Sequence, residues 1–142
     1  MTTFQSFEDI KAWQEGRKLI RSVRIICKKE CTAKDFAFID QIKRSVRSIC
    51  ANIAEGHNSL TNPDFIKFLG YAKRSCAEVH SHLFDALDEG YISKKEFDEL
   101  SAKSLHICNM LGKLIQYLKK TITLKRSTKP TTHNPQPITH YP

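Results

Sequence analysis

Residue types that could perform catalysis are present in this sequence, but their spacing does not assemble a recognisable catalytic site. Nucleophilic catalysis needs a base held beside the nucleophile and a third group that orients the base. None of the six histidines stands in such a context: His57, His80, His82, His106, His133 and His140. His80 and His82 are two positions apart, so on a helix they point to different faces and cannot share a metal ion. We therefore expect a protein that is not an enzyme.

The five cysteines, at positions 27, 31, 50, 76 and 108, contain no CxxC pair. Cys27 and Cys31 are four positions apart and could face one metal ion, but a structural zinc site needs four ligands and no second pair completes it. Cysteine also packs as a small hydrophobic residue, so we expect both as buried, reduced thiols near a helix end. Without a secretory signal or an apolar run of about 20 residues, we expect a cytoplasmic protein with no membrane contact, metal or cofactor.

The clearest functional pattern is a row of positive charges. At 100° per residue, six basic side chains from Lys11 to Lys28 fall within about 140° of one another, away from the apolar face that carries Trp13, Ile20 and Val23. Three further basic residues lie on the outward side of the next segment. The predicted nucleic-acid-binding residues are Arg17, Lys18, Arg21, Arg24, Lys28, Lys43, Arg44 and Arg47. A solvated face that serves only solubility is the alternative interpretation.

The distribution of charge supports a polyanionic or acidic partner. The formal net charge of the chain is +8, of which residues 1–56 carry +4, residues 57–124 carry +1 and residues 125–142 carry +3. The excess therefore lies on the first helical pair and the C-terminal tail. No helix-turn-helix, zinc finger, RNA-recognition motif or aromatic stacking platform is visible, so we expect salt-sensitive phosphate contacts with little base preference.

A second pattern consists of small polar residues at spacings of four, three, four and three: Gln41, Ser45, Ser48, Asn52 and Glu55. Gly56 follows them and predicts a left-handed residue that ends the helix. At that end the helix dipole disfavours the Glu55 carboxylate by roughly 0.3 to 1 kcal/mol, so we expect donors near the start of the next helix to compensate it. We interpret these residues and Gly56 as a polar structural lock or a subunit contact. Catalysis by Glu55, Asn52 and a histidine is the alternative.

These side chains must be positioned by helices. Apolar residues at spacings of three and four predict helices over about 7–29, 35–55, 62–90 and 93–123. Capping boxes at Ser6 and Ser93, a cap at Asn62 and the helix-ending Gly90 support these boundaries. Gly16, Gly70 and Gly112 fall inside predicted helices, which indicates close approach between helices.

The order of elements predicts the fold class. No segment alternates with a period of two, and short connections make successive helices antiparallel neighbours. We predict an all-α protein, an up-down-up-down antiparallel four-helix bundle over residues 1–124. Residues 125–142 contain three basic residues, four prolines and no acidic residue, and we expect them to form a disordered tail.

Particular sequence blocks resemble a known family. Residues 41–56 contain the block Asn-Ile-Ala-Glu-Gly, residues 7–14 carry Phe-Glu-Asp-Ile and Trp-Gln, and residues 90–92 form a Gly-Tyr-Ile turn. Together with Phe65, Phe68, Ser75 and Glu78, these blocks resemble the four-helix-bundle proteins encoded in intervening sequences of bacterial 23S ribosomal RNA genes. The accessory protein of diversity-generating retroelements is a similar bundle.

The resemblance implies a homo-oligomer, commonly a pentameric ring, without enzymatic activity. Combined with the charge pattern, it predicts a protein that binds RNA or DNA mainly through phosphate contacts. The alternative is a scaffold or accessory factor whose basic face binds a protein such as a reverse transcriptase.

Overall fold

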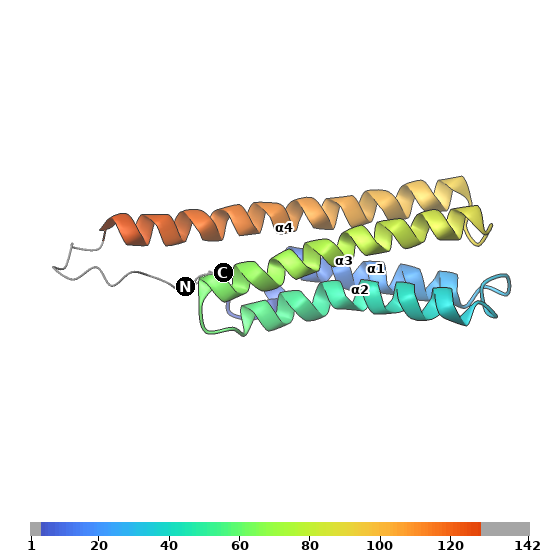
Figure 1. Cartoon of the computed structure of the whole chain (residues 1–142), viewed down its shortest axis with the longest axis horizontal. Coiled ribbons are helices and arrows are strands. Elements are labelled where there is room, and N and C mark those ends of the chain that lie inside the picture. The colour runs from blue at the N-terminus through green and yellow to red at the C-terminus, as the bar shows by residue number, and fades with distance from the viewer. Residues whose placement is uncertain (1–3, 129–142) are drawn as a thin grey trace.

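Four long helices run side by side in the structure, a computed structural model that describes residues 4–128 (Figure 1). A short 3₁₀ turn precedes them, and these residues contain no strand. The elements are η1 (Phe7–Asp9), α1 (Lys11–Cys27), α2 (Phe36–His57), α3 (Asn62–Asp88) and α4 (Lys94–Thr128). Each helix packs against two neighbours, since α1 and α3 both contact α2 and α4. The predicted all-α four-helix bundle is confirmed.

The helix starts follow capping residues. At α4 the predicted box is confirmed: the Ser93 hydroxyl accepts from the Glu96 backbone N–H at 3.1 Å, and the Glu96 carboxylate accepts from the Ser93 N–H at 2.9 Å. Ser6 also forms its predicted box, but it caps η1, because the extended backbone of Ile10 separates η1 from α1. The first α-helix therefore begins at Lys11 and not at residue 7.

The cap of α3 lies one residue earlier than expected. The Thr61 hydroxyl accepts from the Asp64 N–H at 3.2 Å, and this places Asn62 and Pro63 inside the first turn. Proline suits that turn because its missing N–H would have no partner there. Helix α3 ends at Asp88, and Gly90 follows it in the left-handed conformation at φ 75°, as predicted for a helix-ending glycine.

The other three helix ends also differ from the sequence prediction. The prediction that Gly56 ends α2 is wrong, because α2 continues to His57 and Gly56 does not adopt a positive φ. Helix α1 ends at Cys27 instead of residue 29. Helix α4 extends past residue 123 to Thr128, so residues 125–128 are helical, and the remainder of the expected tail lies outside the described residues.

The core lies along the common axis of the four helices. Its centre consists of aliphatic side chains that are fully buried: Leu19, Val23, Ile42, Ile49, Ile53, Leu69, Val79, Leu83, Ile107 and Leu111. Each of these residues belongs to the apolar stripe of its helix, so the buried faces follow the 3.6-residue period. Within residues 4–128 no helix combines the length and apolar character needed to cross a bilayer.

Glycine permits close approach between helices at two positions. A Cβ atom on Gly16 would lie 2.7 Å from the Cys50 Sγ, so α1 and α2 depend on a glycine there. The expectation fails for Gly70, where a Cβ would meet no atom within 4 Å, and for Gly112, where it would make an ordinary contact. The second close approach is at Gly56, which the sequence suggested as a helix end.

Candidate nucleic-acid interface

The predicted basic residues lie on the outward surface of α1 and α2. The four on α1 and Lys28, the C-cap of that helix, are all exposed, as are two of the three on α2, and Lys43 is half-buried. Helices α1 and α2 are packed neighbours, so the two groups of charges occupy adjoining surfaces. We call this surface the basic face, which consists of Arg17, Lys18, Arg21, Arg24, Lys28, Lys43, Arg44 and Arg47.

Two of these cations are paired within their own helix. The Lys18 Nζ lies 2.8 Å from the Glu15 carboxylate, and an Arg44 guanidinium nitrogen lies 3.0 Å from the Asp40 carboxylate. The hydrogen bond from Lys18 lowers the pKa of Glu15. Both pairs are solvent-exposed, and such pairs contribute only about 0 to 1 kcal/mol, so a phosphate can compete for them.

The other six cations of the basic face form no ion pair with any carboxylate among residues 4–128. Arg17 is positioned by an aromatic ring instead, since its guanidinium carbon lies 6.0 Å from the centroid of Trp13. An exposed cation at that distance gains about 0.5 to 1 kcal/mol from the ring. The unpaired set is Arg17, Arg21, Arg24, Lys28, Lys43 and Arg47.

The two helices are joined by a narrow seam, and cations from both lie beside it. Burial raises the pKa of the Cys50 thiol to about 11, and the nearby Arg17 guanidinium opposes this shift. Burial also raises the pKa of Cys27, and there the Lys43 ammonium acts in the opposite direction. A cation of α1 thus acts on a thiol of α2, and a cation of α2 acts on a thiol of α1. Arg17 and Lys43 therefore both lie close to the contact between α1 and α2.

An exposed aromatic ring belongs to this surface, although the sequence analysis found no stacking platform. Phe36, the first residue of α2, is 76% exposed and lines a shallow groove with Ile39, Lys43 and Arg47. Its position three residues before Ile39 resembles that of a core residue, so the periodicity alone hides its exposure. The sequence signal was the pair of basic residues, Lys43 and Arg47, two and three turns after Phe36 on the same face.

The small polar residues of α2 lie along the contact with α3. Ser45 is buried, and its hydroxyl donates to the Ile42 carbonyl oxygen at 3.1 Å. The Asn52 amide donates to the Ser48 hydroxyl at 2.9 Å, and the Ser75 hydroxyl of α3 donates to the same oxygen at 2.9 Å. Ser48 therefore links the two helices, and small residues allow them to approach.

The first and last members of this row of polar residues are exposed, unlike those at its centre. Gln41 and Glu55 are exposed. The Glu55 carboxylate has no hydrogen-bond or ion-pair partner among residues 4–128. The expected compensation of its charge by donors of α3 is therefore absent from the described structure. Gly56 packs tightly, because a Cβ there would lie 2.8 Å from the Phe68 Cβ. The glycine lets the second turn of α3 lie against the end of α2.

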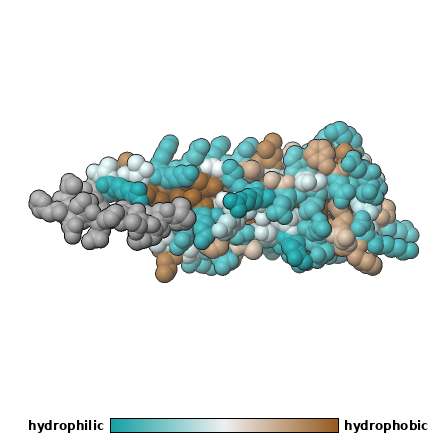
Figure 2. Space-filling model, in the orientation of Figure 1, coloured by the Kyte–Doolittle hydropathy of each residue, from teal (hydrophilic) through white to brown (hydrophobic). Residues whose placement is uncertain are grey.

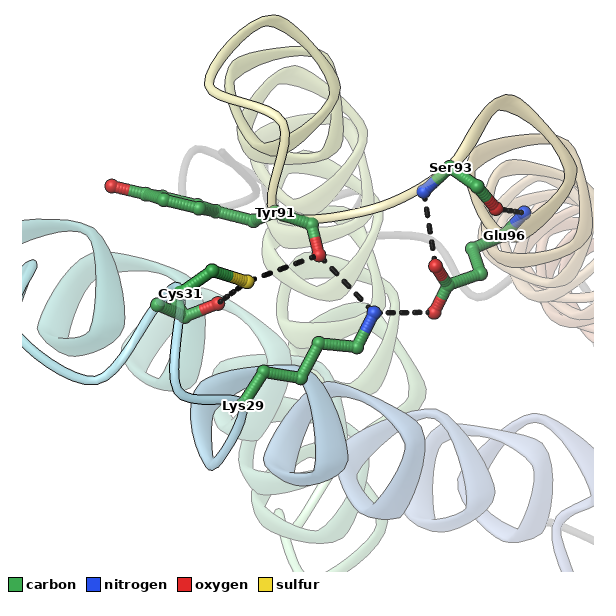
Figure 3. Close-up of polar contacts among 6 residues, drawn as sticks. Lys29, Cys31, Tyr91, Ser93 and Glu96 are labelled. Atoms are coloured by element: carbon green, nitrogen blue, oxygen red, sulfur yellow. Dashed lines mark hydrogen bonds and ion pairs between the residues drawn. The ribbon is translucent and has the colours of Figure 1, made fainter.

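Polar contacts fix the opposite end of the bundle (Figure 3). Lys29, just after α1, donates to the Tyr91 carbonyl at 3.1 Å and forms an ion pair with Glu96 at 2.7 Å. The hydrogen bond from Lys29 lowers the pKa of Glu96. The Tyr91 hydroxyl donates to the Asp35 carboxylate at 2.6 Å. These bonds connect the loop after α1, the start of α2 and the α3–α4 turn.

The side chains that could bind a metal ion or act as nucleophiles are dispersed over the bundle. No group of three or more His, Cys, Asp or Glu side chains within residues 4–128 is placed to hold a metal ion. Cys27 is buried as expected, whereas the expectation of a buried Cys31 is wrong, since it lies on the exposed loop after α1. Burial raises the pKa of the Cys76 thiol to about 12, so it is protonated and unreactive at neutral pH. His133 and His140 lie outside the described residues.

The fold and the basic face define a class, that of helical-bundle proteins with a positively charged helix pair. Residues 8–113 match the model of the 23S rRNA-intervening sequence protein family. The match spans most of the chain, and the chain belongs to this family. The resemblance inferred from the sequence is thus confirmed for the family, while the relation to the retroelement accessory protein stays a prediction.

A solved structure supports the same assignment. The chain is similar to the crystal structure of a protein of unknown function from the S23 ribosomal protein family of Bacteroides thetaiotaomicron. The two share 25% sequence identity with a TM-score of 0.68, over 75% of this chain and 96% of that chain. No curated protein matches this chain significantly.

Proposed function

We propose that this protein binds RNA or DNA through phosphate contacts on the basic face and has no enzymatic activity. The observation that carries the proposal is the set of six cations without a carboxylate partner in the described structure, displayed by two helices that pack closely at Gly16. Phosphates that replace the counterions around such a surface release those ions to solvent, which favours binding at low salt. The name of the family refers to 23S rRNA, and an RNA partner fits that name.

Salt dependence gives the direct test. Six phosphate contacts predict that the logarithm of the association constant falls with the logarithm of salt concentration with a slope of about −4 for a single strand and about −5 for a duplex. Filter binding over a series of salt concentrations measures the slope. A flat profile would reject the proposal.

A matched pair of variants locates the contact. Replacing Arg24 and Arg47 by Gln removes two cations of the basic face, and we expect the slope to become shallower by about one to two units. The control replaces Lys113 and Lys120, two exposed lysines of α4, by Gln. An equal change of slope in the two double variants would show that net charge, and not the basic face, determines binding.

We further propose that the protein is a homo-oligomer, for which the family resemblance implies a pentamer. Large apolar side chains are exposed on the helix pair that carries no part of the basic face, among them Phe84 of α3 and Leu105 and Tyr117 of α4. Figure 2 shows hydrophilic residues over most of one side of the molecule and a hydrophobic area toward the end where α4 extends past the other helices. Light scattering with and without RNA measures the assembly.

The same unpaired cations would attract an acidic protein surface, such as one on a reverse transcriptase. Pulldown from a lysate with and without nuclease treatment separates the two partners. Nuclease should abolish an association that depends on nucleic acid and leave a direct protein contact intact. Genes adjacent to this one would give independent support, since a reverse transcriptase with a template repeat would indicate a retroelement.

A further inference from the structure

The basic face contains a groove whose lining combines an aromatic ring with cations. Among the residues that the structure describes, its lining comes from one side of α2, at spacings of three and one: Phe36, Ile39, Asp40, Lys43, Arg44 and Arg47. Phe36 and Arg47 are eleven positions apart, which is about 16 Å along the helix axis. The ring therefore lies at one end of a row of positive charges, and a chain-like anionic ligand could contact both.

The local structure holds the backbone of Phe36 in place and directs its ring outward. Asp35, the N-cap of α2, accepts hydrogen bonds from the Phe38 N–H at 3.1 Å and from the Tyr91 hydroxyl at 2.6 Å. Phe38 is buried, with its ring centroid 5.2 Å from that of Tyr91. Phe36, two positions earlier, lies on a different side of the helix and stays exposed. The ring thus stands at a firmly anchored helix start.

The charges of the groove favour an anionic ligand. Asp40 is the one carboxylate among the described residues that line the groove, and Arg44 already pairs with it at 3.0 Å. Lys43 and Arg47 have no ion-pair partner among the described residues and are about 6 Å apart along the helix axis. An apolar protein segment would leave these two cations without a counter-charge. A nucleic-acid strand satisfies both features, because it carries phosphates and flat aromatic bases.

We propose that this groove binds single-stranded nucleic acid, with an unpaired base stacked on Phe36 and the adjoining phosphates bound by Lys43 and Arg47. The proposal rests on the nucleic-acid binding proposed above and specifies its substrate. A duplex keeps the faces of its bases inside the stack and offers none to an aromatic side chain, whereas a single strand exposes them. Binding that combines a basic groove with stacking tolerates many sequences.

The test compares four ligands by fluorescence anisotropy at one salt concentration, with the full chain. They are a single-stranded DNA, the RNA of the same sequence, an abasic DNA strand with the same number of phosphates, and the DNA duplex. We expect the single strands to bind more tightly than the duplex and the abasic strand. The DNA and RNA arms show which sugar the groove prefers, and the proposal requires tighter binding of at least one of them.

Substitution of the ring isolates stacking from charge. Phe36→Leu keeps an apolar side chain and removes the ring, and we expect the affinity for the single strand to fall by between about fivefold and a hundredfold. Affinity for the abasic strand and the duplex should stay unchanged. Phe36→Trp should bind the single strand at least as tightly as the wild type. Leu60→Ala is the matched control, since Leu60 is 98% exposed and lies in the loop between α2 and α3.

The outcomes separate this proposal from the proposed function. If the wild type binds every ligand with the same affinity and Phe36→Leu changes nothing, the groove is not a stacking site, although phosphate binding stands. If Phe36→Leu lowers the affinity for the abasic strand as much as the affinity for the intact strand, the ring does not act by stacking on a base. The proposal is then overturned. If the wild type binds none of the four ligands, both proposals fail.

Discussion

The hydroxyl of Tyr91, in the α3–α4 turn, donates a 2.6 Å hydrogen bond to Asp35, the residue that caps α2. Asp35 thereby serves two functions, because its other oxygen accepts the Phe38 N–H. One carboxylate thus connects residues that are 56 positions apart in the sequence and also fixes the start of the helix that carries three of the eight residues of the basic face.

The first prediction concerns the pH range of this contact. The hydrogen bond from Tyr91 lowers the pKa of Asp35, so its contribution to stability is present above the ordinary carboxyl pKa of 3.8 and is lost as the pH falls through the lowered value. The same bond raises the pKa of Tyr91 to about 12, so the contribution is lost again between pH 10 and about 12. We expect Tyr91→Phe to lower Tm between these limits, and the difference from the wild type to shrink outside them.

Thermal unfolding of both proteins over a series of pH values measures this difference. An absorbance titration of the phenol groups should also lose a component near pH 12 in the variant. A constant difference in Tm from pH 2 to pH 12 would contradict the assignment of the contact to these two groups.

The second prediction concerns the close approach of α2 and α3 at Gly56. A Cβ there would lie 2.8 Å from the Phe68 Cβ and 2.9 Å from the Phe65 Cδ1, so Gly56→Ala forces both aromatic residues to shift. We expect the free energy of unfolding in urea to fall by about 1 to 3 kcal/mol. Gly70→Ala is the control in a helix interior with open space, where we expect a gain of roughly 0.5 to 1 kcal/mol. Equal effects of the two variants would exclude a packing role for Gly56.

The third prediction concerns the polar contact between α2 and α3. Ser48 accepts hydrogen bonds from Asn52 and from Ser75, so Ser48→Ala should lower the free energy of unfolding by about 0.5 to 1.5 kcal/mol. A double-mutant cycle of Ser48→Ala with Ser75→Ala isolates the link between the helices, and we expect a coupling energy of at least about 0.5 kcal/mol. Strictly additive losses would show that the two hydroxyls act independently.

The fourth prediction uses the ion pair of Lys18. Glu15 holds the Lys18 ammonium at 2.8 Å, and Glu15→Gln frees this cation and removes a negative charge beside the basic face. We expect the affinity for nucleic acid to rise severalfold at low salt and the gain to vanish at high salt, since salt screens exposed charges. Glu99→Gln, an exposed acidic residue of α4, is the control for net charge. A similar gain in both variants would argue against a localised interface.

The fifth prediction concerns Glu55. This carboxylate is exposed at the C-terminal end of α2, where the helix dipole disfavours it, so Glu55→Gln should raise the free energy of unfolding by roughly 0.3 to 1 kcal/mol. Sedimentation of the variant tests its other proposed role. Loss of assembly with intact folding would assign Glu55 to a subunit contact, whereas unfolding of the variant would disprove its exposed placement.

Much of the bundle could be predicted from local sequence. The apolar stripes, the capping box at Ser93 and the left-handed Gly90 depend on residues within a few positions of one another, and the structure contains each of them. The boundary errors arose where two local signals competed. Thr61 and Asn62 can both cap a helix, and Gly56 suits either a helix end or a close helix contact.

The sequence by itself determined that four amphipathic helices form and that one helix pair carries the excess positive charge, because periodicity and charge are properties of each segment. Only the tertiary structure decided which side chains meet across helices. It paired Tyr91 with Asp35, packed Gly56 against Phe68 and left Phe36 exposed beside Lys43 and Arg47. These relationships depend on the rotation and register of neighbouring helices, which the packing of the whole core sets and no single segment encodes.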